Sequence, residues 1–145
     1  MNDDFCVFIL THGRPNNLIT LDSLKRHGYT GKYCIVIDDE DKTADEYYRL
    51  YGDKVLMFSK EEMSKTFDEG DNFNDRRCII YARNACFKLA EKVGCKYFIQ
   101  LDDDYTSFGY RFHDKQGTLK GRTTRDLDKC FSLMLEFYKS TDVLT

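Results

Sequence analysis

The chain has 145 residues, of which 41% are hydrophobic, 14% aromatic and 32% charged, and its formal net charge is −3 at pH 7. This composition excludes a disordered chain, and the length suffices for one domain, residues 1–145, with one core. The apolar runs are too short to span a bilayer, the N-terminus is acidic rather than signal-like, and the net charge gives no general basic field for nucleic acid. We therefore expect a cytoplasmic protein with no membrane partner.

The cysteines show no CxxC motif and no Cys/His ligand spacing, and several of them lie in apolar segments. A reduced thiol in such a segment behaves as a small hydrophobic group. The sequence therefore predicts neither a zinc site nor a disulfide framework. The six positions are Cys6, Cys34, Cys78, Cys86, Cys95 and Cys130.

The first third of the chain alternates strand and helix patterns. Residues 5–10 (FCVFIL) and 32–37 (KYCIVI) are short continuous apolar runs, which are typical of parallel strands covered on both faces. Between them, residues 16–27 place leucines at three-residue spacing before a glycine, which predicts an amphipathic helix. Residues 43–51 then predict a short helix, and residues 54–58 (KVLMF) predict a third strand.

The rest of the chain continues the alternation. Residues 60–75 are polar and irregular and predict a mobile surface loop beside the ligand. Residues 77–93 predict a long helix, and residues 96–101 (KYFIQL) a strand that ends at three consecutive aspartates. A hairpin over 107–113 and 118–121 and a helix over 124–138 follow. The long helix is expected to bury a stripe made of Ile80, Ala82, Ala85, Phe87, Leu89 and Ala90.

Alternating strands and helices with one antiparallel excursion indicate an α/β fold. We expect a Rossmann-like, mixed but mostly parallel sheet flanked by helices on both faces. In such sheets ligands bind outside the carboxyl ends of the strands, where loops from neighbouring units converge. Three loops meet that description, namely Thr11–Arg14 after the first strand, Asp38–Asp39 after the second, and Asp102–Asp104 after the fourth.

The acidic triplet is the strongest chemical signal in the chain. Consecutive carboxylates repel one another unless a cation compensates, and Mg²⁺ or Mn²⁺ binds carboxylates together with substrate phosphates. In extended backbone Asp102 and Asp104 point to the same side and Asp103 to the other. The pattern therefore predicts that Asp102 and Asp104 share one divalent ion. The alternative is a solvated acidic strand end.

The order of motifs resembles the GT-A glycosyltransferases, particularly their family-two-like members. A strand followed by THGRP, a strand followed by DD, ARNA on a helix and a strand followed by DDD together span about residues 5–105. The THGR opening and the IQLDDDY segment resemble more narrowly the phage glycosyltransferases associated with TET/JBP-type oxygenases, which are thought to decorate hydroxylated DNA pyrimidines. The resemblance implies a GT-A nucleotide-sugar-binding domain, metal-dependent sugar transfer and, for a phage protein, location in the host cytoplasm.

The resemblance also implies roles for individual residues. Thr11, His12 and Arg14 match first-loop residues that touch nucleoside and phosphate, and Asp38 or Asp39 matches the acidic group at the base or ribose. Arg83 and Asn84 match the ARN element facing the nucleotide. In the DxD metal motif, Asp102 and Asp104 match the metal ligands, and Asp103 between them is assigned to the nucleotide sugar. Singly, each has a structural alternative, such as a turn cap for His12, a helix start for Arg14 or a solvated face for Arg83.

Complete members of the family continue into an acceptor-binding region, whereas this sequence ends soon after one more helix. Either acceptor binding is rudimentary, another subunit completes it, or the sequence is a fragment. No catalytic base can be assigned, because Asp126 and Asp128 are equally well explained as acids at a helix N-terminus.

We expect sugar transfer from a nucleoside-diphosphate sugar, a UDP-sugar above all, to an acceptor hydroxyl, with hydroxymethylpyrimidine in phage DNA as the narrower acceptor. For DNA, the expected contact surface is a basic run with Tyr110 and Phe112 interleaved, although an ordinary solvated hairpin explains it equally well. Alternatives are nucleotidyl transfer, whose glycine-rich first loop is absent, and a catalytically incomplete nucleotide-binding or interaction domain. The run comprises Arg111, His113, Lys115, Lys120, Arg122 and Arg125.

Overall fold

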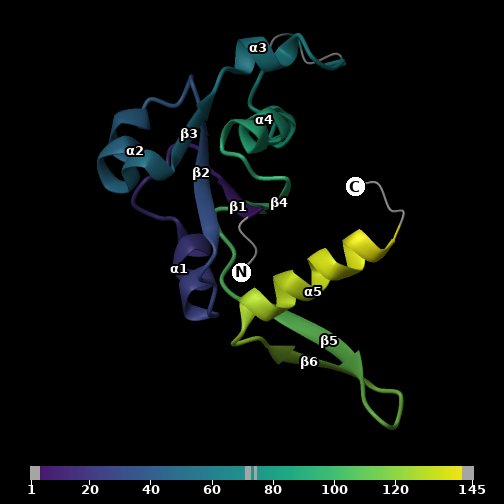
Figure 1. Ribbon diagram of the computed structural model, residues 1–145. Helices are drawn as coiled ribbons and strands as arrows, with labels where there is room; N and C mark the ends of the chain where they lie inside the picture. Colours follow the sequence, from purple (N-terminus) through teal and green to yellow (C-terminus); the bar gives the residue numbers. More distant parts are fainter. Residues whose placement is uncertain (1–3, 71–72, 74, 142–145) are drawn as a thin grey trace.

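A parallel sheet forms the centre of the protein. The computed structural model describes residues 4–70, 73 and 75–141. In sheet order, its four strands are β3 (Val55–Phe58), β2 (Lys32–Asp38), β1 (Phe5–Leu10) and β4 (Tyr97–Asp102), and every neighbouring pair is parallel. The α/β class with a parallel sheet flanked by helices is confirmed. The expected mixed sheet is not seen, because the antiparallel pair forms a separate sheet (Figure 1).

Helices cover both faces of the sheet. On one face, α1 (Ile19–Arg26) and α2 (Ala44–Tyr51) connect the first three strands, and a 3₁₀ turn, η1 (Gly52–Lys54), leads from α2 into β3. The last helix, α5 (Leu127–Ser140), packs on that same face. The described part of the chain contains no helix long and apolar enough to cross a membrane.

On the opposite face, α3 (Lys60–Ser64) and α4 (Ile80–Lys92) lie between β3 and β4 in the chain. The chain therefore moves outward from β1 through β2 to β3, then crosses back to place β4 on the other side of β1. This reversal makes the β1–β4 border the topological switch point, where open α/β sheets bind ligands.

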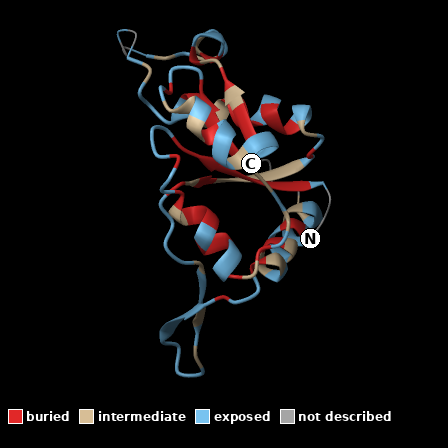
Figure 2. Ribbon diagram, turned by 90° about the vertical axis from the view of Figure 1, so that its left-hand side faces the viewer, coloured by how far each residue is buried: buried red, intermediate tan, exposed pale blue. Residues whose placement is uncertain are grey.

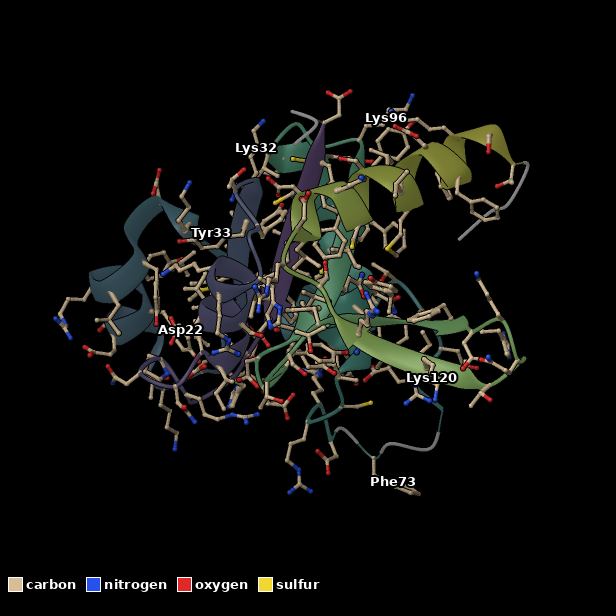
Figure 3. All side chains as sticks on the ribbon, turned by 90° about the horizontal axis from the view of Figure 1, so that it is seen from below. Asp22, Lys32, Tyr33, Phe73, Lys96 and Lys120 are labelled. Carbon is tan, nitrogen blue, oxygen red and sulfur yellow. The ribbon has the colours of Figure 1, made fainter. Side chains whose placement is uncertain are left out.

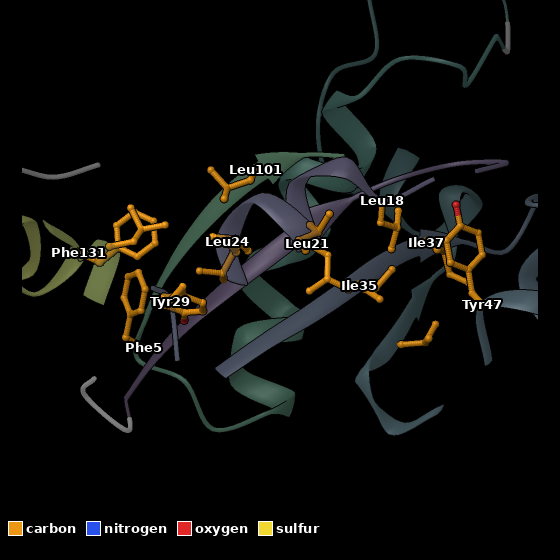
Figure 4. Close-up of a cluster of buried hydrophobic side chains, with 14 of the residues drawn as sticks. Phe5, Leu18, Leu21, Leu24, Tyr29, Ile35, Ile37, Tyr47, Leu101 and Phe131 are labelled. Carbon is orange, nitrogen blue, oxygen red and sulfur yellow. The ribbon is translucent and has the colours of Figure 1, made fainter. Parts of the chain in front are cut away.

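The central strand β1 shows why the sheet is stable. All six of its residues are buried, and their side chains alternate between the two faces. Val7 and Ile9 belong to the cluster drawn in Figure 4, together with the α1 leucines, whereas Phe8 packs into the cluster under α4. Burying each such side chain contributes roughly 1.5–3 kcal/mol, so the strands that carry the site loops are held on both faces.

The long helix differs from its prediction in start and face. It begins at Ile80 rather than residue 77, and its buried side chains are Tyr81, Ala85, Cys86, Leu89 and Ala90. Ala85, Leu89 and Ala90 were expected to be buried, but Ile80 and Phe87 are 42% and 56% exposed. Ile80 and Phe87 are seven residues apart and share a helix face that lies at the border of the packed face, where the Phe87 ring still contacts Phe98 of β4 edge-on with centroids 5.2 Å apart.

The segment predicted as an irregular loop over residues 60–75 begins with the short helix α3. Ser59 caps this helix by accepting a hydrogen bond from the Glu62 N–H at 3.4 Å. The sequence carries the corresponding signature, because Ser followed three residues later by Glu is a capping box. Residues 71, 72 and 74 of the expected loop lie outside the described residues.

The hairpin consists of β5 (Gly109–His113) and β6 (Leu119–Thr123), close to the predicted ranges. It projects beyond the body of the protein next to α5 (Figure 1), and nearly all of its residues are exposed (Figure 2). The chain then enters α5 at Asp126, whose carboxylate accepts a hydrogen bond from the Lys129 N–H at 3.0 Å.

Candidate functional site

A cavity of about 550 Å³ opens at the carboxyl ends of the strands. It lies at the β1–β4 border and receives residues from the carboxyl ends of the four strands or the segments that follow them, and from the start of α4. The lining includes eight of the ten residues that the sequence assigned to donor or metal binding. These are Thr11, His12, Arg14, Asp38, Arg83, Asp102, Asp103 and Asp104.

A closed ring of three hydrogen bonds and one ion pair joins the first loop to the acidic triplet. The Thr11 hydroxyl donates to Asp103 Oδ2 at 2.6 Å and accepts from the Tyr47 hydroxyl at 2.9 Å. The Tyr47 oxygen in turn accepts from the Arg14 N–H at 2.9 Å, and Arg14 Nε lies 3.3 Å from Asp103 Oδ2. Burial raises the pKa of Tyr47 and outweighs the effect of its hydrogen bonds with Thr11 and Arg14. The Asp103 side chain is thus satisfied inside the protein.

A second charged group lies at the β2 side of the cavity. The Asp38 carboxylate contacts His12 Nδ1 at 2.7 Å through one oxygen and Lys60 Nζ at 3.0 Å through the other. The Asp38 and Lys60 side chains are only 7% and 9% exposed, whereas that of His12 is 55% exposed. A buried carboxylate with a buried ammonium is costly to separate, so this pair holds the imidazole in place at the cavity.

Asp41 fixes the backbone of the first loop. Its Oδ2 accepts a 2.7 Å hydrogen bond from the Gly13 N–H, and its Oδ1 accepts from both the N–H and the hydroxyl of Thr43. Burial alone would raise the pKa of Asp41, but these hydrogen bonds outweigh it and hold the pKa below its usual value. Gly13 has φ +71°, a left-handed conformation that favours glycine and turns the loop toward Asp41.

The first member of the triplet lies against the helix that carries ARNA. Asp102 Oδ1 and Arg83 Nη2 are 2.9 Å apart, and the two side chains are 44% and 40% exposed. Gln100 donates to the Arg83 carbonyl at 2.9 Å, which ties α4 to β4. An arginine next to an exposed carboxylate offers positive charge to an anionic ligand in the same cavity.

The third member, Asp104, is exposed, and among the described residues no side chain forms an ion pair or hydrogen bond with it. Within the part of the chain that the structure describes, no three His, Cys, Asp or Glu side chains gather as a metal cluster. The protein thus offers two exposed carboxylates, Asp102 and Asp104, rather than a complete ligand set. Mg²⁺ and Mn²⁺ fit such a site when substrate phosphates supply further oxygens.

Thr20 anchors the acidic loop to the start of α1. Its N–H donates to the Asp103 carbonyl at 3.0 Å, and its hydroxyl donates to the Asp102 carbonyl at 2.5 Å. The same hydroxyl accepts from the Tyr105 N–H at 2.8 Å. The backbone of the triplet is therefore held in place before any ligand binds.

Two of the predicted donor-binding residues lie outside this lining. The Asp39 carboxylate accepts a 3.0 Å hydrogen bond from the Lys60 N–H at the start of α3, and Asn84 is half-buried on α4. Their contacts with a nucleotide stay predictions. Of the two candidate bases, Asp126 caps α5, and Asp128 accepts two hydrogen bonds from Thr30. Each therefore has a structural role.

Lys60 and Tyr47 are two of the contributors that the sequence analysis missed, in addition to Asp41 and Thr20. Lys60 is the second residue after the third strand, and the rule that selected the other three loops would have found it there. Tyr47 left no such signal, because its hydroxyl reaches the site only through the packing of α2 against the sheet.

Comparison with known proteins identifies one family. The model of the family described as TET-Associated Glycosyltransferase matches residues 5–145. No curated protein and no solved structure shows significant similarity to the chain.

Proposed function

The chain belongs to the TET-associated glycosyltransferases and is a glycosyltransferase, and we propose that its donor is a nucleoside-diphosphate sugar bound in the cavity at the β1–β4 border. The observation that carries the proposal is the meeting of Arg83 and Asp102 with the loop after β1 in one cavity. A UDP-sugar is the donor we favour. Family membership also favours sugar transfer over nucleotidyl transfer.

The charges around the cavity support a diphosphate ligand. Arg14 on the β1 loop and Arg83 on α4 both line it, and both side chains are about half exposed. Guanidinium groups form paired hydrogen bonds with phosphate oxygens and stay charged at every physiological pH. The His12–Asp38 pair lies on the β2 side, where it would contact the nucleoside.

We propose that Asp102 and Asp104 hold Mn²⁺ or Mg²⁺ together with the donor. When bound, the ion would act as a Lewis acid on the charge that develops on the leaving phosphate oxygen. Because the protein supplies only two exposed carboxylates, we expect the ion to bind tightly only when the diphosphate is present. Asp103 is engaged by Thr11 and Arg14 and orients the loop instead.

In the proposed reaction, an oxygen of the acceptor hydroxyl bonds to the anomeric carbon while the bond from that carbon to the diphosphate breaks. The electron pair leaves with the diphosphate, and the hydroxyl proton passes to a base. Arg83 and Arg14 are placed to stabilise the diphosphate as its charge increases. The acceptor that we propose is a hydroxymethylated pyrimidine in DNA.

Calorimetric titration with UDP and UDP-glucose, with and without Mn²⁺, tests the donor site. We expect binding that requires Mn²⁺ and is lost in the Asp102→Asn, Asp104→Asn double variant. The matched control is Asp53→Asn, which removes an exposed carboxylate at the opposite edge of the sheet, just before β3. Equal binding with and without Mn²⁺, or none by any nucleoside diphosphate, would contradict the proposal.

Product analysis tests the reaction itself. Incubation of the donor with an oligonucleotide containing 5-hydroxymethylcytosine should release the nucleoside diphosphate and add one sugar mass to the strand. Release of inorganic pyrophosphate would indicate nucleotidyl transfer instead.

A further inference from the structure

The strand register of the hairpin sorts its side chains onto two faces. Tyr110 lies opposite Arg122, and Phe112 lies opposite Lys120. Directly opposed residues in an antiparallel pair share a face, as do residues two apart in one strand. Two aromatic rings on β5 and two cations on β6 therefore form one surface, the aromatic-basic face. The other face carries Arg111 and His113 but no Phe, Tyr or Trp side chain.

This face is exposed and locally positive. Tyr110 is 49% exposed, and Lys120 and Arg122 are also exposed, on a hairpin that projects in front of the molecule in Figure 3. Residues 105–125 contain five Lys or Arg side chains and one acidic side chain, whereas the whole chain carries a net charge of −3. The positive charge is thus concentrated where a polyanion can reach it.

The two aromatic rings on this face are not part of either hydrophobic core cluster. The Tyr110 and Phe112 centroids are 6.1 Å apart, and the Arg122 guanidinium lies 5.6 Å from the Phe112 centroid. A two-stranded hairpin has little stability of its own, and the exposed Tyr110 and half-buried Phe112 lie outside both clusters, so they add little by burial. Aromatic rings interleaved with cations are instead the arrangement on which bases of a single strand stack while the cations contact phosphates.

The base of the hairpin is fixed to the body of the protein. The Thr124 N–H donates to the Phe108 carbonyl at 3.1 Å, and His27 Nδ1 contacts the Thr124 carbonyl at 2.7 Å. Phe108 packs edge-on against the His27 ring, with centroids 5.8 Å apart. The hairpin therefore starts from a defined direction rather than from a loose linker.

The hairpin also begins close to the proposed metal ligands. Only four residues separate Asp104 from Gly109, which limits their Cα separation to about 18 Å. Within this connection the Thr106 carbonyl accepts a 2.5 Å hydrogen bond from Arg26, so α1 holds the connection as well. A strand bound along the hairpin can thus present a nearby nucleotide to the cavity.

We propose that the aromatic-basic face binds single-stranded DNA and guides it to the sugar-transfer site. The proposal rests on the proposed function for the use of the strand as acceptor. A base that undergoes chemistry has to leave the duplex stack, and an unstacked base has its π-face free for Tyr110 or Phe112. Lys120 and Arg122 neutralise phosphates of the same strand.

Fluorescence anisotropy with a labelled oligothymidylate of about 16 nucleotides tests this face in EDTA and without nucleotide. We expect the Lys120→Gln, Arg122→Gln double variant to bind the strand about tenfold more weakly. The slope of the logarithm of the binding constant against the logarithm of the salt concentration should also become about 1.4 less steep, because each of the two lost phosphate contacts accounts for about 0.7. We expect Tyr110→Leu, Phe112→Leu to weaken binding about tenfold at unchanged slope, because stacking releases no counterions.

The matched control is Arg111→Gln, Lys115→Gln, which removes two positive charges from the opposite face and the turn. It should weaken binding less than threefold, and a matched duplex should bind the wild type more weakly than the single strand. Equal losses in both charge variants, no loss in the aromatic variant, or equal affinity for the duplex would each overturn the proposal.

The donor site is measured separately in the same proteins. Each hairpin variant should bind UDP with Mn²⁺ as the wild type does, which also shows that it is folded. If the wild type binds the strand in the expected pattern but binds no nucleoside diphosphate, the donor proposal fails and the strand surface stands. Nucleotide binding without strand binding would overturn the strand surface and leave the donor site supported.

Discussion

The Thr11 hydroxyl donates a 2.6 Å hydrogen bond to the Asp103 carboxylate, across 92 residues of sequence. This contact divides the acidic triplet into two roles. The Asp103 side chain is 3% exposed and joins the β1 and β4 loops, whereas the Asp102 side chain is 44% exposed at the cavity. The structural role of Asp103 and the proposed metal-binding role of Asp102 can therefore be separated by mutation.

The Thr11–Asp103 contact should contribute measurably to stability. Thr11→Val removes a donor from a buried carboxylate, and we expect it to lower the free energy of unfolding by about 1–3 kcal/mol. Urea denaturation at pH 7 measures the change. Thr11→Ser keeps the hydroxyl and should stay close to the wild type. An unchanged unfolding midpoint in Thr11→Val would show that the bond adds nothing to stability.

The Lys60–Asp38 pair is predicted to couple strongly. Lys60→Met leaves the buried Asp38 carboxylate with the half-exposed His12 and the Glu40 N–H as partners but without its buried cation, and should cost about 3 kcal/mol of unfolding free energy. Adding Asp38→Asn removes the unpaired charge, so the double variant should be more stable than the sum of the two single changes predicts. A double-mutant cycle from urea denaturation gives the coupling, and strict additivity would contradict it.

The depressed pKa of Asp41 predicts a specific acid response. Because its folded-state pKa lies below its unfolded value of about 3.9, the ionised side chain contributes stability that is fully present above that value. The contribution disappears as the pH falls through the folded-state pKa. The difference in unfolding free energy between wild type and Asp41→Asn should thus be constant from about pH 5 to 7 and shrink below about pH 4.

Thr43→Ala is the control for this acid response. It keeps the Asp41 carboxylate but removes the hydroxyl that donates to it at 2.6 Å. The pKa of Asp41 should move back toward its ordinary value, so the variant should show a weaker dependence of stability on pH. Identical acid responses in wild type and Thr43→Ala would assign the depressed pKa to the backbone donors alone.

Thiol labelling provides a readout of cavity occupancy. Cys78 is exposed and lines the cavity, whereas Cys86 is fully buried and burial raises its pKa to about 12. In the folded protein at pH 8 we expect dithionitrobenzoate to react with Cys78, and Cys86 to react only after unfolding. UDP with Mn²⁺ should slow the Cys78 reaction at least several-fold.

The Cys78→Ser variant identifies the protected thiol in this assay. It should lose the ligand-sensitive phase while any reaction of the half-buried Cys34 and Cys130 continues. Protection that persists in Cys78→Ser would place the ligand elsewhere on the protein.

Local pattern in the sequence was sufficient for the order of elements and for the edge of the sheet that carries the site. Strands such as Phe5–Leu10 are continuous apolar runs, and a parallel sheet brings their carboxyl ends together wherever the helices pack. For this reason Thr11, Asp38 and Asp102 could be placed around one cavity before the fold was known. The start of the α3 helix could also have been predicted from the sequence, because Ser59 and Glu62 form a capping box.

Contacts between distant segments were decided only by the tertiary structure. The sequence could not show that Asp103 is held by Thr11 and Arg14, that Lys60 pairs with Asp38, or that Ile80 and Phe87 stay partly exposed. The physical reason is that periodicity and spacing fix how one segment folds, whereas the partner of a buried charge depends on how separate segments pack. A carboxylate becomes structural or ligand-binding according to the donors that packing brings within hydrogen-bonding distance.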